Sequence, residues 1–305
     1  MNYTLYRLRF TAPVHFGNGR LGKTEMTFYA DTLFSALCTE AQKMHGNGAA
    51  ELYDAAVSGR LRISDGLPYC SDTLFVPKPM TAVESSESGD SKLKKAFKKL
   101  HYIPLEDIDA YLGGEYDPQE ANKMLDTLGK TSEQARVAVG RGDDSEPYSV
   151  GTFTFDEECG LYFIGAGDDD TSSLLDEIID NLSYIGIGGK ISSGLGRFEY
   201  SYEDVPDELL KRIEGTYDRY MSLSVCMAAD EELESVVEGS GYELIRRSGF
   251  VASSEYSETA LKKRDFYSFK AGACFSKRFE GGVFDVSAGG THPVYRYAIP
   301  MLMGL

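Results

Sequence analysis

The chain has 305 residues, of which 42% are hydrophobic and 26% are charged, so a disordered protein is excluded and there is room for about two domains. Its formal net charge of −17 would exclude a nucleic-acid-binding protein if the acidic side chains were spread evenly along the chain. However, residues 143–180 carry −12 and residues 203–238 carry −8, so the other 231 residues carry +3 and can still face a polyanion.

The N-terminal segment begins with a strand whose apolar residues alternate over both faces. A polar loop that contains glycine follows at residues 15–19. Next, Asp31-Thr32 predicts the N-cap of a helix that runs to about Met44. The strands expected in this part of the chain are 3–11, 61–63 and 73–76.

Residues 81–135 differ in character and indicate an insertion. A polar linker leads into residues 92–100, where five lysines fall within eight positions and the apolar residues recur at helical spacing. This pattern predicts a basic amphipathic helix. The lysines of this helix either form a solvated face over a small satellite core, or they contact phosphates or a partner protein. The candidate RNA contacts on this helix are Lys92, Lys94 and Lys95.

Regular structure resumes after the insertion. Segments 152–155 and 161–164 flank a turn in the manner of a hairpin. Thr171 or Ser172 is expected to cap a helix through Tyr184, with the acidic run 168–170 exposed at its start. Segment 152–155 belongs to a strand expected at 150–155, and further strands are expected at 136–141 and 199–202.

A domain boundary is expected near residues 203–208. Beyond it the sequence predicts a short acidic helix at 230–238 and strands at 220–227, 242–251, 266–275 and 294–303. Two α+β units with antiparallel sheets fit this order better than a parallel sheet, in which strands and helices would alternate throughout. We therefore predict domains at residues 1–203 and 204–305.

Residues 186–197 form a glycine-rich loop with five glycines in eleven positions. A nucleotide P-loop is excluded because Ile191 follows Lys190, and a dinucleotide fingerprint is excluded because here a helix precedes the loop and a strand follows it. The loop either grips a sugar-phosphate backbone or is a tight helix-to-strand connection. Its candidate RNA contacts are Gly188, Gly189, Lys190, Ser192, Ser193, Gly194 and Arg197.

Four motifs carry a resemblance to a known family. They are Gly-Ile-Gly-Gly-Lys-Ile-Ser-Ser-Gly-Leu-Gly-Arg-Phe (186–198), Leu-Arg-Phe-Thr-Ala-Pro-Val-His-Phe-Gly (8–17), Ala-Asp-Thr-Leu-Phe-Ser-Ala-Leu-Cys (30–38) and His-Pro-Val-Tyr-Arg-Tyr (292–297). The first resembles the signature of the RAMP superfamily of CRISPR-associated proteins. Together, over nearly the whole chain, they resemble the fourth Csm subunits of type III-A effector complexes, a Cas-five-like group.

The resemblance implies two ferredoxin-like (RRM-like) domains, with the glycine loop and a helical, basic insertion in the first. It also implies a subunit without catalysis, cofactor or metal that holds the repeat-derived 5′ tag of the CRISPR RNA (crRNA). The implied protein partners are the large Cas-ten-type subunit and the first Csm-three-type backbone subunit. A single-stranded tag suits this chemistry, because its bases can stack on aromatic rings while cations and hydroxyls contact its backbone.

His15 keeps an enzymatic alternative open. RNA-processing relatives in the superfamily cleave the repeat with a histidine-containing site, so the alternative is a metal-independent endoribonuclease. We expect instead that His15 positions the first loop or contacts the RNA backbone. A protein–protein adaptor without RNA contact is a third possibility, which the overall acidity favours.

Residues 262–278 form a second basic stretch that carries +5 and has interleaved aromatic residues. It is either the polar face of a hairpin or a further RNA contact. Outside the glycine loop, the expected RNA contacts are His15, Gly17, Lys92, Lys94, Lys95, Arg141, Arg264, Arg278 and Arg296.

The cysteines and the N-terminus predict a cytoplasmic protein. Five cysteines, no two closer than 32 positions, form no C-x-x-C motif and fit free thiols in a reducing compartment. The first ten residues lack the apolar core of a signal peptide, and no segment is apolar for the length of a membrane span.

Overall fold

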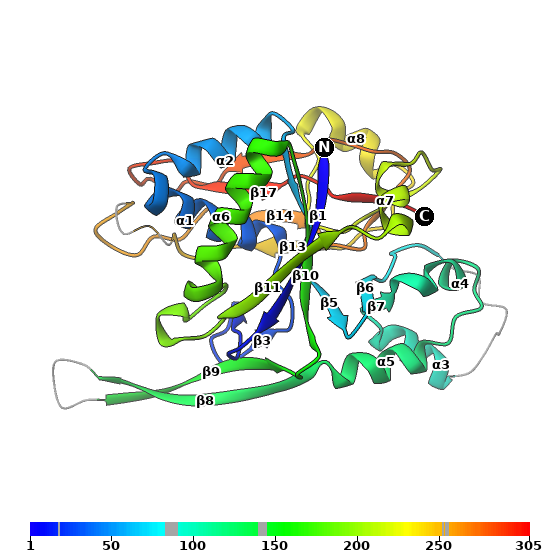
Figure 1. Ribbon diagram of the computed structural model, residues 1–305, viewed down its shortest axis with the longest axis horizontal. Helices are drawn as coiled ribbons and strands as arrows, with labels where there is room; N and C mark the ends of the chain where they lie inside the picture. Colours follow the sequence, from blue (N-terminus) through cyan, green and yellow to red (C-terminus); the bar gives the residue numbers. More distant parts are fainter. Residues whose placement is uncertain (18, 83–90, 140–144, 252, 254–255) are drawn as a thin grey trace.

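The computed structural model describes residues 1–17, 19–82, 91–139, 145–251, 253 and 256–305, which form an α+β fold with antiparallel sheets, as predicted (Figure 1). In these residues the main sheet has the strand order β11-β1-β10-β5-β6-β7, and β4 also pairs with β10. The strands are β1 (Asn2–Phe10), β4 (Leu61–Ile63), β5 (Leu67–Cys70), β6 (Thr73–Pro77), β7 (Tyr102–Pro104), β10 (Cys159–Gly167) and β11 (Phe198–Asp204).

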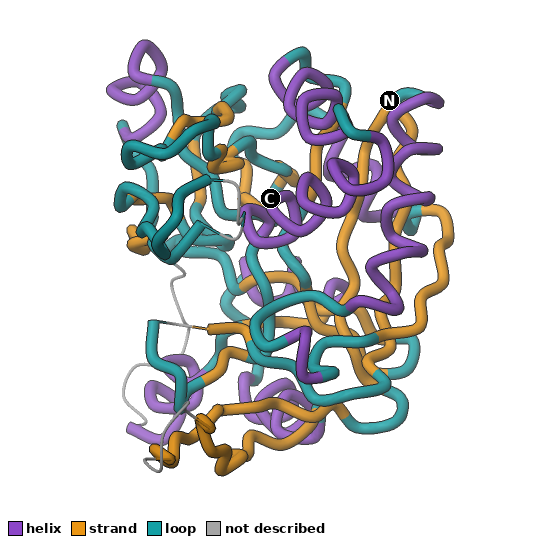
Figure 2. The backbone as a smooth tube through the Cα atoms, turned by 90° about the vertical axis from the view of Figure 1, so that its left-hand side faces the viewer, coloured by secondary structure: helices purple, strands orange, loops and turns teal. Residues whose placement is uncertain are grey.

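The main sheet separates two hydrophobic cores. The alternation predicted for the first strand is confirmed, because Tyr6 and Leu8 face one core while Leu5 faces the other. The first core packs under the long helices α1 (Ala30–His45), α2 (Gly48–Val57) and α6 (Asp169–Ile185). Seen from the side, these long helices gather near the N-terminus, and loops and short strands dominate the opposite side (Figure 2).

The predicted insertion, residues 81–135, contains a small helical region and the beginning of a long hairpin that extends beyond it. Its helices are α3 (Ser91–Lys99), η1 (Leu105–Asp107), α4 (Ile108–Leu112) and α5 (Pro118–Thr127). The lysine-rich helix is confirmed as α3, and none of its side chains is buried. Strands β8 (Gly129–Val139) and β9 (Ser145–Phe155) pair over their whole length and form an arm that leaves the body of the molecule (Figure 1).

The C-terminal part packs on the second core. Its helices are α7 (Asp207–Glu214) and α8 (Asp230–Val237), the latter confirming the predicted acidic helix. The predicted strands are shorter or divided: β12 (Tyr220–Ser222), β13 (Leu244–Arg247), β14 (Phe266–Phe269), β15 (Cys274–Phe275), β17 (Tyr295–Ala298) and β18 (Leu302–Gly304). Strand β16 (Gly282–Asp285) was not predicted. The second core joins residues from both sides of position 203, and the two-domain division stays a prediction.

Two predicted helix caps are wrong. Helix α1 begins after Tyr29 without a side-chain cap, because Asp31 lies inside its first turn and is engaged in ion pairs. Helix α6 is capped by Asp168, whose carboxylate accepts a hydrogen bond from the Thr171 amide at 2.9 Å.

The predicted hairpin of segments 152–155 and 161–164 is also wrong. Strand β10 is buried along its whole length and pairs with β1 on one side and with β4 and β5 on the other. Neither edge of β10 is therefore open to β9, which pairs with β8 instead.

Asp65 joins the start of α1 to the C-terminal part. One of its carboxylate oxygens accepts the amide hydrogens of Ala30 at 2.7 Å and Val225 at 2.9 Å. Burial raises the pKa of this carboxyl to about 7, although the two amides oppose the shift.

Asp65 makes the stability depend on pH. Because its pKa is raised in the folded chain, its contribution is complete below about pH 4 and is lost as pH rises through about 7. As pH rises from about 4 to 7, we expect the free energy of unfolding of the wild type to fall relative to that of Asp65→Asn, by up to about 1.4 kcal/mol per pH unit. Urea titrations of both proteins between pH 4 and 8 measure this difference, and parallel profiles would contradict it.

Candidate nucleic-acid interface

The glycine-rich loop connects α6 to β11, and several of its residues have positive φ angles. Gly186 ends the helix at a φ of 99°, and Lys190 and Gly194, at φ of 61° and 82°, flank the short turn η2 (Ile191–Ser193). Lys190 is not glycine, so its left-handed backbone is costly and marks a position that the surrounding structure constrains.

The loop packs closely on the segment that contains His15. The Gly189 amide donates to the His15 carbonyl at 2.8 Å, and the Gly196 amide donates to that of Pro13 at 2.9 Å. A Cβ added at Gly188 would lie 2.8 Å from the His15 oxygen, so this approach requires glycine. The glycine-rich motif and the motif that contains His15, far apart along the chain, therefore meet in one structural unit.

Backbone amides of the loop serve its own structure more than an anion. Six of them, at residues 186, 187, 189, 193, 194 and 196, donate to protein carbonyls. The donors of this loop that are left for a ligand are therefore mainly side chains, since Ser192, Ser193 and Arg197 are exposed and Lys190 is half-buried. The Lys190 ammonium lies 5.4 Å from the ring centre of Tyr148 on β9.

Two glycines of the loop form a matched test of this packing. Gly194 and Gly196 share a positive φ of about 80°, but a Cβ at Gly196 would lie 2.1 Å from the Ile187 oxygen, whereas one at Gly194 meets no atom within 4 Å. We expect Gly194→Ala to cost about 1–2 kcal/mol of unfolding free energy and Gly196→Ala about 1–3 kcal/mol more. If urea unfolding gave equal losses of unfolding free energy for the two variants, the positive φ and not the close packing would be the reason for glycine at both positions.

His15 is buried, with 6% of its surface exposed, and its Nδ1 lies 2.6 Å from the carbonyl oxygen of Gly151. This contact fixes the imidazole and leaves Nε2 as the nitrogen that is available to a ligand. Gly17 is exposed beside it, and a Cβ there would lie 3.5 Å from Nε2. His15 therefore connects the glycine loop to β9, and its positioning role stays a prediction.

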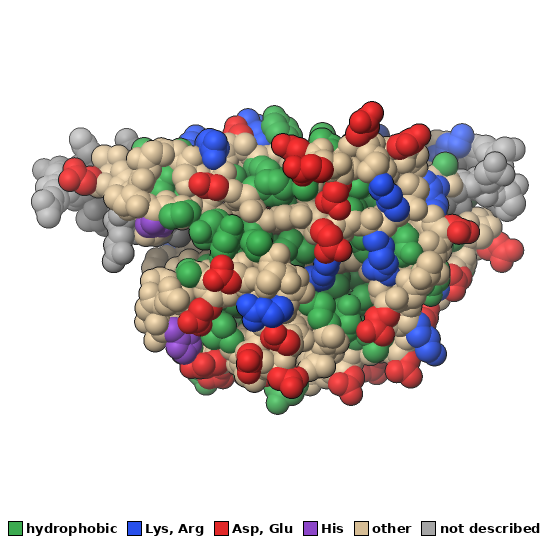
Figure 3. All heavy atoms as spheres, turned by 90° about the horizontal axis from the view of Figure 1, so that it is seen from above, with side chains coloured by type: hydrophobic (Ala, Val, Ile, Leu, Met, Phe, Trp, Pro, Cys, Tyr) green, Lys and Arg blue, Asp and Glu red, His purple; other side chains and the backbone are tan. Residues whose placement is uncertain are grey.

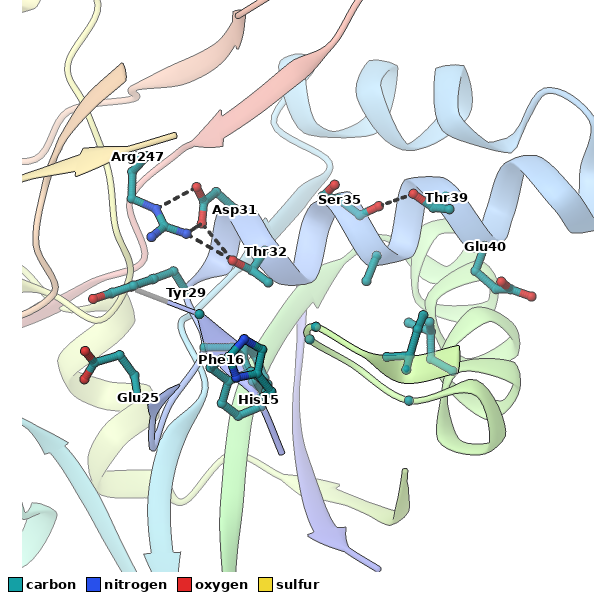
Figure 4. Close-up of a pocket in the computed structure, with 18 of the residues that line it drawn as sticks. His15, Phe16, Glu25, Tyr29, Asp31, Thr32, Ser35, Thr39, Glu40 and Arg247 are labelled. Carbon is teal, nitrogen blue, oxygen red and sulfur yellow. Dashed lines mark hydrogen bonds and ion pairs between the residues drawn. The ribbon is translucent and has the colours of Figure 1, made fainter. Parts of the chain in front are cut away.

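A cavity of about 310 Å³ opens between α1, the glycine loop and the His15 segment (Figure 4). Its volume is at the lower end of those that hold small ligands. Along α1 the cavity is lined by a polar helix face whose residues are spaced three or four apart, Thr32, Ser35, Thr39 and Lys43, together with the adjacent Glu40. The glycine loop contributes Gly186, Gly188, Gly189 and Ile191.

Charged residues from three elements meet at one end of this cavity. Asp31 on α1 accepts two hydrogen bonds from Arg247 of β13, at 2.9 and 2.8 Å, and also pairs with Arg296 of β17. Burial alone would raise the pKa of Asp31, but the two guanidinium groups lower it to about 2. Figure 4 shows Arg247 bridging Asp31 and Thr32 at the start of the helix.

The structure brings only part of the predicted set together. His15, Gly17, Gly188, Gly189 and Arg296 line the cavity. Lys190, Ser192, Ser193, Gly194 and Arg197 belong to the same loop but are not among the lining residues.

The other predicted contacts lie elsewhere or have structural partners. Lys92, Lys94 and Lys95 lie on α3, at the far side of the molecule from α6 and the glycine loop (Figure 1). Arg264 donates to the Asp285 carbonyl at 2.7 Å. Arg278 donates to the carbonyls of Ile213 and Gly215, and Arg141 lies outside the described residues.

Most of the other lining residues were not predicted, and Tyr29, Arg247 and Lys263 are among those that were missed. Lys263 lay within the basic stretch 262–278 but was not separated from its neighbours. Arg247 carried no local signal, because its partner Asp31 is 216 positions away in the chain.

The acidic blocks do not form the wall of this cavity. Of its lining residues in the described chain, none comes from 143–180 or 203–238, and its carboxylates are Glu25, Asp31 and Glu40. The view from above shows acidic side chains scattered over the outer surface, with cations between them (Figure 3). This placement leaves the cavity accessible to a polyanion.

Neither a metal centre nor a membrane-spanning helix is found among the described residues. No group of three or more His, Cys, Asp or Glu side chains among them is placed to hold a metal ion. No helix among them has the length and apolar character needed to cross a membrane.

Comparisons with known proteins identify two family models in this chain. Residues 7–199 match the RAMP superfamily, and residues 216–305 match the CRISPR Csm4 C-terminal domain. A CRISPR system Cms protein Csm4 of Mycobacterium tuberculosis (strain CDC 1551 / Oshkosh) is 37% identical over 100% of this chain and 98% of the relative. The protein of the same name from Streptococcus thermophilus is 35% identical over 100% of this chain and 99% of its own length.

Solved structures share the fold at lower identity. A chain from the crystal structure of the Csm3-Csm4 subcomplex of the type III-A interference complex superposes with a TM-score of 0.67 at 18% identity, with 100% of this chain and 99% of that chain covered. A chain from the Csm1-Csm4 cassette bound to AMPPNP gives a TM-score of 0.63 at 19% identity, with 99% and 97% covered.

Proposed function

Because this chain belongs to the Csm4 family of the RAMP superfamily, we propose that it is a non-catalytic subunit of a cytoplasmic type III-A CRISPR effector complex. In this proposal it holds the repeat-derived 5′ tag of the crRNA. It also links the large Cas-ten-type subunit to the first Csm-three-type backbone subunit. The protein–protein part is supported by family relatives whose solved structures are complexes with Csm3 and with Csm1.

The RNA part is supported by one observation: the glycine loop and His15 border a cavity of about 310 Å³ that also has cations at its end. Single-stranded RNA can place a splayed nucleotide in such a cavity, while its neighbouring phosphates meet side chains on the rim. Lys190, Ser192, Ser193 and Arg197 are the rim donors that we assign to this role. Nε2 of His15 can accept a hydrogen bond from a ribose 2′-hydroxyl.

The remaining predicted contacts fit a second, separate surface. Helix α3 exposes Lys92, Lys94 and Lys95 and is anchored to α5, where Asn122 donates to the Ala96 carbonyl at 3.0 Å. We propose that this helix meets either the continuing RNA or an adjacent subunit. Arg264 and Arg278 remain candidate contacts of the C-terminal part with an RNA-bound neighbour.

Co-expression of the full chain with Csm1- and Csm3-type partners and a crRNA tests the proposal. We expect the chain to co-purify with both proteins and with the crRNA. Recovery with both proteins but with no RNA contact would instead support an adaptor. Incubation of the purified chain with labelled repeat RNA in EDTA should leave the RNA intact, and a cut product would support the endoribonuclease alternative.

A further inference from the structure

Arg296 has an unsatisfied guanidinium group. The side chain is 5% exposed and pairs with Asp31 through Nη1, but its Nε and Nη2 are buried and have no hydrogen-bond partner. A buried donor without an acceptor is costly, so such atoms indicate that a ligand or water supplies the acceptor. Because Arg296 lines the cavity described above, that acceptor can come from a molecule bound there.

The same end of the cavity carries more positive than negative charge. Arg247, Arg296 and Lys263 line it, and Asp31 is the carboxylate that pairs with the two arginines. Glu40 pairs with Lys43 at 2.9 Å, and the exposed Glu25 lies on the other side of Tyr29 from Asp31 (Figure 4). Burial, together with the nearby Arg296, lowers the pKa of Lys263 to about 8, as expected for an ammonium without its counter-anion.

We propose that this end of the cavity binds a phosphate group through Lys263 and the free donors of Arg296, with Arg247 and Asp31 holding Arg296 in place. The inference rests on the proposed function, in which the phosphate belongs to the single-stranded tag RNA. A phosphate suits the site because it offers several acceptor oxygens and negative charge to a planar guanidinium and an ammonium. The hydroxyls of Thr32 and Ser35 on α1 line the same cavity and can contact the attached ribose.

This assignment gives the C-terminal part of the chain a direct role in RNA binding. Lys263 and Arg296 follow the predicted boundary, whereas the glycine loop and α1 precede it. A nucleotide in the cavity would therefore contact both halves of the chain. Bound RNA should then stabilise the packing of the two halves as well as occupy the site.

Neighbouring lysines provide a matched pair of variants. Lys263 lines the cavity, while Lys262 is exposed with its ammonium 5.6 Å from the Phe250 ring centre. Among the described residues, no carboxylate lies within ion-pair distance of the Lys263 ammonium, so Lys263→Met orphans no buried charge and should fold. Thermal unfolding of both variants verifies this before binding is measured.

The test is a titration of the full chain with fluorescent tag RNA. We expect Lys263→Met to weaken binding about tenfold and Lys262→Met to stay within about twofold of wild type. A series of RNAs then replaces one phosphodiester at a time with a neutral methylphosphonate. At one position, the methylphosphonate should weaken RNA binding by the wild type about as much as Lys263→Met does. The same methylphosphonate should not weaken RNA binding by Lys263→Met any further.

Two results would overturn the phosphate site while leaving the proposed function intact: equal binding by the two lysine variants, or the absence of any methylphosphonate position whose effect disappears in Lys263→Met. Failure of the wild type to bind tag RNA would instead contradict the proposed function. In that case, thermal-shift titrations with inorganic phosphate and with a nucleoside monophosphate decide about the site. Stabilisation of wild type but not of Lys263→Met would support a free-phosphate ligand, and no stabilisation would reject the site.

Discussion

Replacement of Asp31 by asparagine is expected to lower the free energy of unfolding by about 3–5 kcal/mol. The carboxylate is buried and pairs with both Arg247 and Arg296, so its removal leaves two guanidinium groups without their counter-charge. These contacts join α1 to β13 and β17, which lie more than 200 positions later in the chain. Urea unfolding at neutral pH, monitored by circular dichroism, measures the loss.

A surface pair provides the control for this variant. Asp265 lies 3.7 Å from Arg246, and both side chains are largely exposed, so Asp265→Asn should change the unfolding free energy by less than about 1 kcal/mol. Comparable effects of the two substitutions would contradict the buried cluster as the main ionic link between the N-terminal and C-terminal parts.

The double variant Lys190→Ala/Arg197→Ala is expected to weaken tag-RNA binding by about 10- to 100-fold. Arg197 is exposed and Lys190 half-buried on the loop that borders the cavity, and most loop amides are already engaged by protein carbonyls. If each cation neutralises one phosphate, the slope of log K against log salt should become shallower by about 1.4. Fluorescence anisotropy over a series of salt concentrations measures both quantities.

Two exposed cations remote from the loop serve as the matched control. Arg60 follows α2 and Lys211 lies on α7, and neither lines the cavity. The variant Arg60→Ala/Lys211→Ala should keep wild-type affinity and nearly its salt slope. Equal losses of RNA affinity in the two double variants would mean that RNA binding depends on the overall charge of the chain. Unchanged affinity in the Lys190→Ala/Arg197→Ala variant would show that these loop cations do not bind the RNA.

The sequence predicts local structure well where one helix face or strand face determines it. The alternation of the first strand, the lysine-rich helix and the acidic helix at 230–237 all appear in the structure. Prediction from the sequence fails where a residue far away in the chain binds a side chain that would otherwise interact with its neighbours in sequence. Asp31 resembles an N-cap in its local context, but two arginines from the C-terminal part engage it, and Asp168 caps α6 in place of Thr171.

Strand pairing shows the same limit. A turn between segments 152–155 and 161–164 predicts a hairpin, but β10 already has partners on both edges. Occupancy of an edge depends on β1 and β5, which lie elsewhere in the chain, so no local pattern reveals it.

The interface was partly predictable for related reasons. Glycine density and the resemblance of the motifs identified the loop and the His15 segment, and the structure places them in direct contact through the Gly189 amide and the His15 carbonyl. The cationic end of the cavity was not predictable, because Arg247, Lys263 and Arg296 come together only through long-range packing. Arg296 was selected from its motif, but its buried pairing with Asp31 required the structure.

The net charge of the chain does not describe the charge of the cavity. The value of −17 describes the whole chain, whereas the cavity is lined by Lys43, Arg247, Lys263 and Arg296 as well as by three carboxylates. Local arrangement therefore determines whether this acidic protein can hold a polyanion.

Ultraviolet crosslinking of the assembled complex, followed by mass spectrometry of the RNA-bound peptides, tests whether the glycine loop and the His15 segment hold the tag. We predict that the crRNA tag crosslinks to peptides that contain residues 15–17 and residues 188–197 of this chain. Tag crosslinks confined to α3 or to the β13–β14 hairpin, with none on those two segments, would contradict it.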